Sequence, residues 1–132
     1  MRVELRVAVV LVVGILAGCG GTKGAGAVAL GTDVTLAPGQ SIRLARDGVK
    51  IKFVGVTGDS RCPRGVSCVW EGDATVTLSD AGKTSYQLHT NAGAVRMVMI
   101  SGHEVRLVRL SPQPRAGSPI QQRDYRATLR ID

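Results

Sequence analysis

Val49-Lys50-Ile51-Lys52-Phe53 places an apolar side chain at every second position and a lysine between each pair. A β-strand with one face buried and the other in water produces this alternation, because successive side chains point to opposite faces. Asp47-Gly48, directly before it, is a dipeptide typical of a tight hairpin turn. The segment therefore predicts a half-buried antiparallel strand that pairs with the residues preceding the turn.

The same period of two continues through most of the chain on both sides of this strand. Turn-forming pairs such as Pro38-Gly39 and Ala81-Gly82 interrupt it at intervals of about eight to twelve residues. The segment 104–110 changes parity between Leu107 and Val108, which predicts a β-bulge or burial on both faces. The apolar positions of the other expected strands are Val34 and Leu36; Ile42 and Leu44; Ala74, Val76 and Leu78; Tyr86 and Leu88; Val95, Met97 and Met99; and Tyr125, Ala127, Leu129 and Ile131.

These segments give about seven or eight short strands between residues 33 and 132, and none of them has the period of an amphipathic helix. Each strand has one apolar face, which two stacked sheets can bury together. We therefore expect an all-β fold, a single antiparallel sandwich of the immunoglobulin-like kind, with a small barrel as the alternative.

The composition fits one folded domain that does not bind nucleic acid. The 132 residues are 44% apolar and 20% charged, with a net charge of +7, and a chain of this length forms one domain. Aromatic residues make up only 3%, whereas proteins that stack on bases need several aromatic platforms. We expect no nucleic-acid partner and no cofactor, and the positive charge suits an anionic envelope surface or solubility alone.

The first residues have the pattern of an export signal. Arg2 and Arg6 precede an apolar run at residues 7–17, which is shorter than the roughly 18 residues that a membrane span needs. The run ends in Leu16-Ala17-Gly18-Cys19, which resembles the lipobox of bacterial lipoproteins. The resemblance implies that residues 1–18 are a signal peptide that is removed, and that Cys19 carries the lipid that anchors the mature chain.

The lipobox also implies domain boundaries and a location. Residues 19–32 hold the lipidated cysteine and a Gly-rich flexible tether, and residues 33–132 form the sandwich domain. The protein is then exported and lipid-anchored to the cell envelope. Gly20 follows the lipidated position, and by resemblance to proteobacterial sorting the absence of Asp there favours the periplasmic side of the outer membrane, if the organism has two membranes.

Two cysteines remain once Cys19 is assigned to the lipid. Cys62 and Cys68 are then the only pair left within the chain, and disulfides persist in an exported protein. Pro63 and Gly65 between them favour the turn that closes so small a loop. We therefore expect a disulfide between Cys62 and Cys68.

Residues 59–72, DSRCPRGVSCVWEG, resemble a block shared by an uncharacterised group of small bacterial lipoproteins and exported proteins, DSRCP-x(4)-C-x-W-x-G. The same group has a later L-x-P-x-P element followed by Asp-Tyr, matched here by residues 110–114 and by Asp124-Tyr125. The resemblance implies an envelope location and a β domain, and it brings no activity with it.

The loop between the cysteines has two interpretations. Arg61 and Arg64 stand on what would be a rigid tip, a typical place for partner contact, and a sharper version offers one of them to a trypsin-like protease, as an inhibitor does. Alternatively, the disulfide only tethers a long connection. In either case we expect Asp59 and Ser60 to accept backbone hydrogen bonds at the loop entry. We also expect Trp70 to start the next strand and to pack beneath the loop in the core.

Four residues carry the ligand types of a soft copper site, namely His89, His103, Met97 and Met99. However, alternation places both methionines with Val95 on the apolar face of a strand, as ordinary core residues. It places His89 on a solvated face and His103 in a turn. No ligand spacing links them, so we expect no metal site.

The sequence contains no motif of nucleophilic, zinc-dependent or phosphate-binding catalysis. Asp59, Glu71 and Asp73 would suit a carboxylate pair or a calcium site if they met at one end of the sandwich. Acidic residues in loops usually serve solubility and turn formation instead. We expect no enzymatic activity.

Five basic residues lie on the polar faces of the expected strands, namely Lys50, Lys52, Arg96, Arg126 and Arg130. They either form a basic face that meets anionic lipid headgroups or wall polymers, or they are simply solvated. The sequence favours a non-catalytic, lipid-anchored binding or structural module whose partners are the membrane, through its lipid, and an envelope protein or anionic polymer. A secreted inhibitor of trypsin-like proteases is the alternative, and a copper-binding envelope protein is the third candidate.

Overall fold

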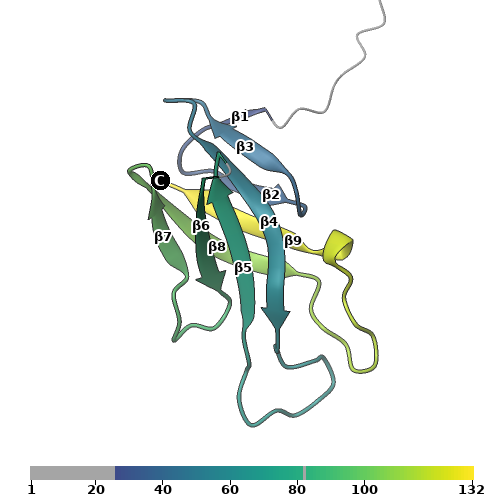
Figure 1. The fold of residues 1–132 in the computed structure, drawn as a ribbon. Helices are drawn as coiled ribbons and strands as arrows, with labels where there is room; N and C mark the ends of the chain where they lie inside the picture. Colours follow the sequence, from purple (N-terminus) through teal and green to yellow (C-terminus); the bar gives the residue numbers. More distant parts are fainter. Residues whose placement is uncertain (1–25, 82) are drawn as a thin grey trace, which may run out of the picture.

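The computed structural model describes residues 26–81 and 83–132, which form two stacked β-sheets (Figure 1). The first sheet has the strand order β1-β3-β4-β5-β6, and the second has the order β2-β9-β8-β7. A short 3₁₀ turn, η1 (Gln122–Asp124), precedes the last strand. The strands are β1 (Ala27–Val28), β2 (Asp33–Leu36), β3 (Ser41–Leu44), β4 (Lys50–Asp59), β5 (Ala74–Asp80), β6 (Thr84–His89), β7 (Met97–Ile100), β8 (His103–Ser111) and β9 (Arg126–Ile131).

The sandwich predicted from the alternation is confirmed. The sheets do not close into a barrel, because the hydrogen-bonded ladders end at β1 and β6 in one sheet and at β2 and β7 in the other. Consecutive strands form two antiparallel meanders, β3 to β6 and β7 to β9. One pair departs from the expected antiparallel arrangement, since β1 runs parallel to β3. Through it, Ala27 and Val28 of the predicted tether join the first sheet.

The predicted signal peptide, residues 1–18, and the predicted lipidation site, Cys19, lie outside the described residues. The part of the chain that the structure describes contains no helix with the length and hydropathy of a membrane span.

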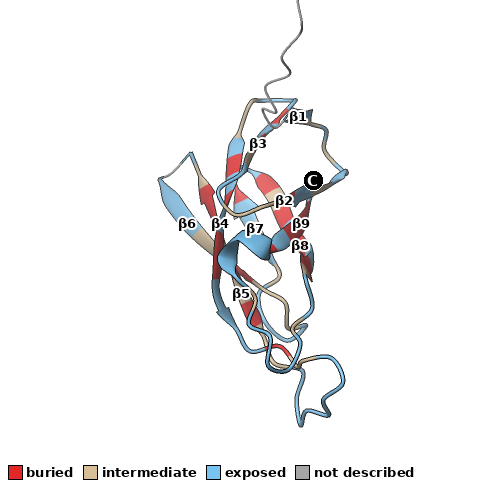
Figure 2. Cartoon of the chain, turned by 90° about the vertical axis from the view of Figure 1, so that its right-hand side faces the viewer, coloured by how far each residue is buried: buried red, intermediate tan, exposed pale blue. Residues whose placement is uncertain are grey.

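The apolar faces of the two sheets meet to form the core (Figure 2). Ile51 and Phe53 on β4 are fully buried, whereas Lys50 and Lys52 are exposed, as the alternation predicts. The register between β8 and β9 shifts between Leu107 and Arg109, which confirms the irregularity expected from the change of parity. The other large side chains that are fully buried are Leu44, Leu78, Leu88, Ile100, Leu107, Leu129, Ile131, Val76 and Val105.

Strand β7 turns the opposite face inward from the one predicted. Ile100 is buried and Val98 packs partly against the core. The register explains this. Met97 lies opposite Arg106 on β8 and Met99 lies opposite Glu104. Because cross-strand partners share a face, the two methionines lie on the same face as these charged side chains. In and just before this strand, the side chains that were expected in the core but are exposed are Val95, Met97 and Met99.

The two ends of the sandwich hold different parts of the chain. β1 and the connection between β3 and β4 lie at one end, and the long connection between β4 and β5 extends from the other end (Figure 1). The connections from β6 to β7 and from β8 to β9 lie at this second end as well. Among the described residues, the second end therefore carries most of the irregular chain, and functional sites often lie on such loops.

Candidate functional site

The connection between β4 and β5 is closed by the predicted disulfide. Cys62 and Cys68 are joined, with their Cα atoms 6.0 Å apart. The two limbs below the disulfide extend the pairing of β4 with β5, because the Cys62 N–H donates to the Glu71 carbonyl at 3.0 Å and the Ser60 N–H donates to the Asp73 carbonyl at 2.6 Å. Ser60 Oγ also accepts the Asp73 N–H at 3.2 Å, as expected at the loop entry. We call residues 59–62 and 71–73 the neck, and residues 63–70 the tip.

A buried arginine fixes the outgoing limb of the neck. Arg61 is 9% exposed, and its guanidinium donates to both oxygens of the Asp59 carboxylate, at 2.8 and 2.7 Å. It also donates to the carbonyl oxygens of Leu110 and Pro112, both at 2.9 Å, and the Tyr125 hydroxyl donates to Asp59 at 2.9 Å. Asp59 accepts the Arg61 backbone N–H at 3.2 Å, in its expected role. Arg61 therefore holds the neck to the end of β8 and is not the exposed contact residue that the sequence suggested.

This network shifts the pKa of two groups in opposite directions. Burial alone would raise the pKa of Asp59, but the hydrogen bonds from Arg61 and Tyr125 outweigh burial and hold that pKa below its usual value. Burial and the hydrogen bond to the Asp59 carboxylate raise the pKa of Tyr125 to about 12. Asp59 is therefore charged and Tyr125 neutral throughout the neutral range, and the ion pair of the neck stays intact there.

The free energy of unfolding is expected to fall at both ends of the pH scale. The lowered pKa of Asp59 contributes stability that is present above the unfolded value near 4 and is lost as the pH falls through the folded value. The raised pKa of Tyr125 contributes stability that is present below about pH 10 and is lost as the pH rises toward about 12. Urea unfolding at a series of pH values measures both losses. Tyr125→Phe should reduce the alkaline loss, and identical alkaline profiles for the two chains would contradict this account.

The returning limb of the neck is fixed to the connection between β6 and β7. Asp73 accepts the backbone N–H groups of Thr90 and Asn91, each at 3.0 Å, and is hydrogen-bonded to His89. The Asn91 amide in turn donates to the Gly72 carbonyl at 3.0 Å. Burial would raise the pKa of Asp73, but the hydrogen bonds from Asn91, His89 and Thr90 lower it overall. Both limbs of the neck are thus bound to other parts of the sandwich.

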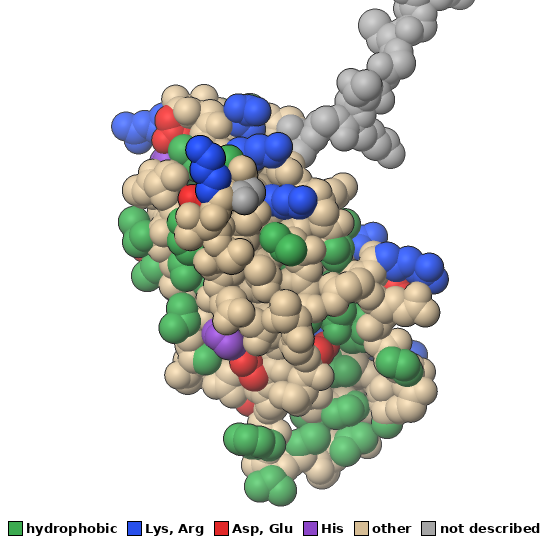
Figure 3. Space-filling model, in the orientation of Figure 1, with side chains coloured by type: hydrophobic (Ala, Val, Ile, Leu, Met, Phe, Trp, Pro, Cys, Tyr) green, Lys and Arg blue, Asp and Glu red, His purple; other side chains and the backbone are tan. Residues whose placement is uncertain are grey.

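Beyond the neck, the tip is apolar and exposed. Val66 is 46% exposed, Val69 is fully exposed and Trp70 is 82% exposed. Hydrophobic side chains gather at this end of the molecule (Figure 3). The prediction that Trp70 starts the next strand and packs in the core is wrong, because β5 begins only at Ala74. Residues 69 and 70 lie outside the β-ladder, so strand alternation does not turn the indole toward the core.

Arg64 is the only one of the two predicted contact arginines whose side chain is exposed, but its backbone is held. Its N–H donates to the Pro114 carbonyl at 2.9 Å, and Gly65 follows with a φ of +79°. A peptide that pairs with another protein's strand, as a protease inhibitor does, presents an extended backbone with free hydrogen-bonding groups. At Arg64 the backbone N–H is not free, because it already pairs with the Pro114 carbonyl of the same chain.

The five residues of the predicted basic face are divided between the two sheets. Lys50 and Lys52 lie on β4 in the first sheet, whereas Arg126 and Arg130 lie on β9 in the second sheet, and Arg96 directly precedes β7. These side chains therefore do not form one surface. Alternation predicts which face of its strand a residue occupies, but it does not predict which sheet the strand joins.

The candidate metal ligands are not brought together. His89 is hydrogen-bonded to Asp73, while His103 begins β8, is buried, and is hydrogen-bonded to Asp47 at 2.6 Å. His103 therefore lies in a strand and not in the expected turn, while His89 is partly exposed, with 26% of its side chain in contact with solvent. Within residues 26–81 and 83–132, no group of three or more His, Cys, Asp and Glu side chains is arranged to hold a metal ion. The three carboxylates that the sequence suggested as a calcium or catalytic cluster also belong to no such metal-binding group. They are Asp59, Glu71 and Asp73.

Sequence reasoning missed the contacts that hold the neck. Arg61 reaches carbonyl groups that lie 49 and 51 positions later in the chain, and Asp59 reaches Tyr125, 66 positions later. The one available signal was the resemblance, which named the blocks at residues 59–72, 110–114 and 124–125 together. Comparison of the chain with models of known protein families, with curated proteins and with solved structures gives no match.

Proposed function

We propose that this protein is a lipid-anchored, non-catalytic module of the cell envelope that binds a protein partner through the tip. The exposure of the Trp70 side chain is the observation that carries the proposal. The other distinctive residues of this connection have structural roles: the cysteines close the loop, Asp59 and Arg61 fix the neck, and Gly72 allows the neck to turn. Trp70 has no such structural role and is 82% exposed.

The tip has the properties of a pre-organised contact surface. Tryptophan is among the residues that contribute most to protein interfaces, especially when neighbouring contacts exclude water. Val66 and Val69, which also belong to the tip, add further exposed apolar surface. The disulfide and the neck already restrict the loop. Binding of a partner to the tip therefore costs less free energy for ordering the loop than binding to a flexible loop would cost.

The position of the tip supports a partner that lies away from the anchoring membrane. β1, where the described chain begins, lies at the opposite end of the sandwich from the tip (Figure 1). If Cys19 is acylated, the lipid holds the β1 end near the bilayer. The tip, at the opposite end, then points away from the bilayer.

Site-specific photo-cross-linking in the source organism tests this proposal. A photoreactive amino acid at position 69 leaves Trp70 in place, and the same probe at Gln87, an exposed residue of β6, is the matched control. We expect one discrete cross-linked protein from position 69 and none from position 87. We also expect Trp70→Ser to reduce that product at least about tenfold, as loss of a central tryptophan does at other interfaces.

Two outcomes would contradict the proposal. Equal cross-linking from both positions would mean that the tip has no specific partner. Stoichiometric inhibition of trypsin that Arg64→Ala abolishes would instead favour the protease-inhibitor alternative.

A further inference from the structure

Two cations face each other directly across β3 and β4. The register pairs Arg43 with Lys50, and both side chains are exposed. Like charges placed directly opposite each other destabilise a sheet. Lys83, in the connection between β5 and β6, lines the same hollow as these two residues. We call Arg43, Lys50 and Lys83 the cationic corner.

The cationic corner has a carboxylate beside it, because Asp80 lines the same hollow. None of its three residues forms an ion pair within residues 26–81 and 83–132. The two aspartates nearest in the chain already have partners. Asp47 is hydrogen-bonded to His103 at 2.6 Å, and Asp80 accepts the Thr84 N–H at 2.8 Å and the Tyr86 hydroxyl at 3.2 Å. Three cations beside the single carboxylate of Asp80 still leave this surface net positive and able to bind an external anion.

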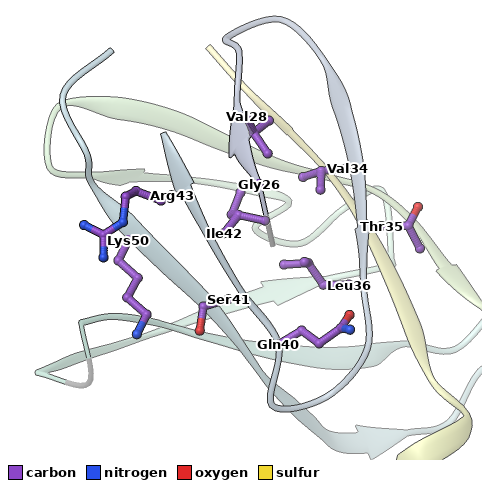
Figure 4. A pocket seen from close by; sticks show the side chains of 10 residues that line it. All are labelled: Gly26, Val28, Val34, Thr35, Leu36, Gln40, Ser41, Ile42, Arg43 and Lys50. Atoms are coloured by element: carbon purple, nitrogen blue, oxygen red, sulfur yellow. The ribbon is translucent and has the colours of Figure 1, made fainter. Parts of the chain in front are cut away.

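Two hollows, each lined in part by Arg43 and Lys50, leave room for such an anion. One, of about 610 Å³, is lined by Arg43 and Lys50 and by apolar side chains of β2 and β3 (Figure 4). Figure 4 shows the two cations on one side of this hollow and Val34 and Leu36 on the other. The second hollow, of about 380 Å³, includes Lys83. Guanidinium and ammonium groups are the side chains that bind phosphate best, and an apolar wall beside them suits an amphipathic anion.

The cationic corner lies at the β1 end of the molecule, where lysine and arginine side chains gather (Figure 3). Gly26 itself lines the first hollow. The extended chain from Cys19 to Gly26 spans at most about 25 Å, so acylation of Cys19 keeps Gly26, in the lining of the first hollow, within about that distance of the bilayer. We propose that the cationic corner binds the phosphate groups of anionic phospholipids in the anchoring membrane and so holds the tip away from it. This inference rests on the lipid anchor of the proposed function.

Vesicle partition of residues 19–132 with Cys19→Ser tests the inference, because no acyl chain then contributes to binding. We expect binding to phosphatidylcholine vesicles that contain phosphatidylglycerol, no binding to phosphatidylcholine alone, and release at about 1 M salt, where the Debye length is about 3 Å. Arg43→Gln with Lys50→Gln should weaken the partition about 25-fold, at about fivefold for each cation. Arg109→Gln with Arg123→Gln removes the same charge elsewhere on the surface and should change it by less than about twofold.

The variants themselves separate a membrane site from a structural role. Arg43→Gln with Lys50→Gln should melt no lower than the unchanged chain, because it removes a like-charge pair. Equal losses in the two double variants, or no binding to the anionic vesicles, would overturn the inference. Binding to soluble polyphosphate without binding to vesicles would overturn it in favour of a wall polymer. None of these results depends on the tip or on acylation, so each leaves the proposed function to its own test.

Discussion

Arg61→Gln is expected to lower the free energy of unfolding by about 3–5 kcal/mol, the usual loss when one partner of a buried ion pair is removed. The substitution leaves the Asp59 carboxylate, whose side chain is 11% exposed, without its cation. It also leaves the carbonyl groups of Leu110 and Pro112 without the donors that they have in the folded protein. Urea unfolding at neutral pH measures the loss.

Arg64→Gln is the matched control, because Arg64 is exposed and makes no side-chain ion pair among the described residues. It should change the free energy of unfolding by no more than about 0.5 kcal/mol. Adding Asp59→Asn to Arg61→Gln should cost less than the two single losses summed, since the second substitution removes the unpaired charge. Equal losses for Arg61→Gln and Arg64→Gln would show that the neck does not depend on the ion pair.

Gly72→Ala is expected to be comparably damaging, with a loss of about 3–5 kcal/mol. Gly72 has a φ of +70°, which L side chains rarely adopt, and an added Cβ would lie 1.9 Å from the Ser60 carbonyl oxygen. That oxygen belongs to the neck backbone and cannot move away without breaking the pairing of the two limbs. The free energy of unfolding from urea titration gives the size of the effect.

Gly65→Ala separates the two causes of that loss. Gly65 has a similar φ of +79°, but an added Cβ there meets nothing within 4 Å. It should therefore lose only about 1 kcal/mol, the ordinary penalty for alanine at a positive φ. If Gly65→Ala and Gly72→Ala were equally destabilising, close packing of the neck at Gly72 would play no part in stability.

Alternation predicted the strands well wherever one face of a strand was clearly polar. Lys50 and Lys52 leave Ile51 and Phe53 only one orientation, and the structure has that orientation. Alternation continued from Val95 placed Met97 and Met99 inward, and this was wrong because residues 97–100 are all apolar and neither face is marked as polar. Pairing with charged residues on β8 decides which side is buried. The choice of face was therefore wrong only where the sequence pattern was ambiguous.

The site was less predictable because its geometry depends on contacts between distant parts of the chain. The disulfide followed from counting cysteines, whereas the burial of Arg61 depends on carbonyl groups of a different connection. The exposure of Trp70 was missed because aromatic residues are most often buried, and its loop position overrides that tendency. Long-range contacts of this kind leave no trace in local periodicity.

We propose a chain with a lipid at one end and a disulfide-closed contact loop at the other. The intact mass of the protein purified from its source under non-reducing conditions tests both chemical features at once. We expect the mass of residues 19–132 with acyl groups added at Cys19 and two hydrogens fewer than the reduced chain. An unacylated chain with free thiols at Cys62 and Cys68 would contradict it.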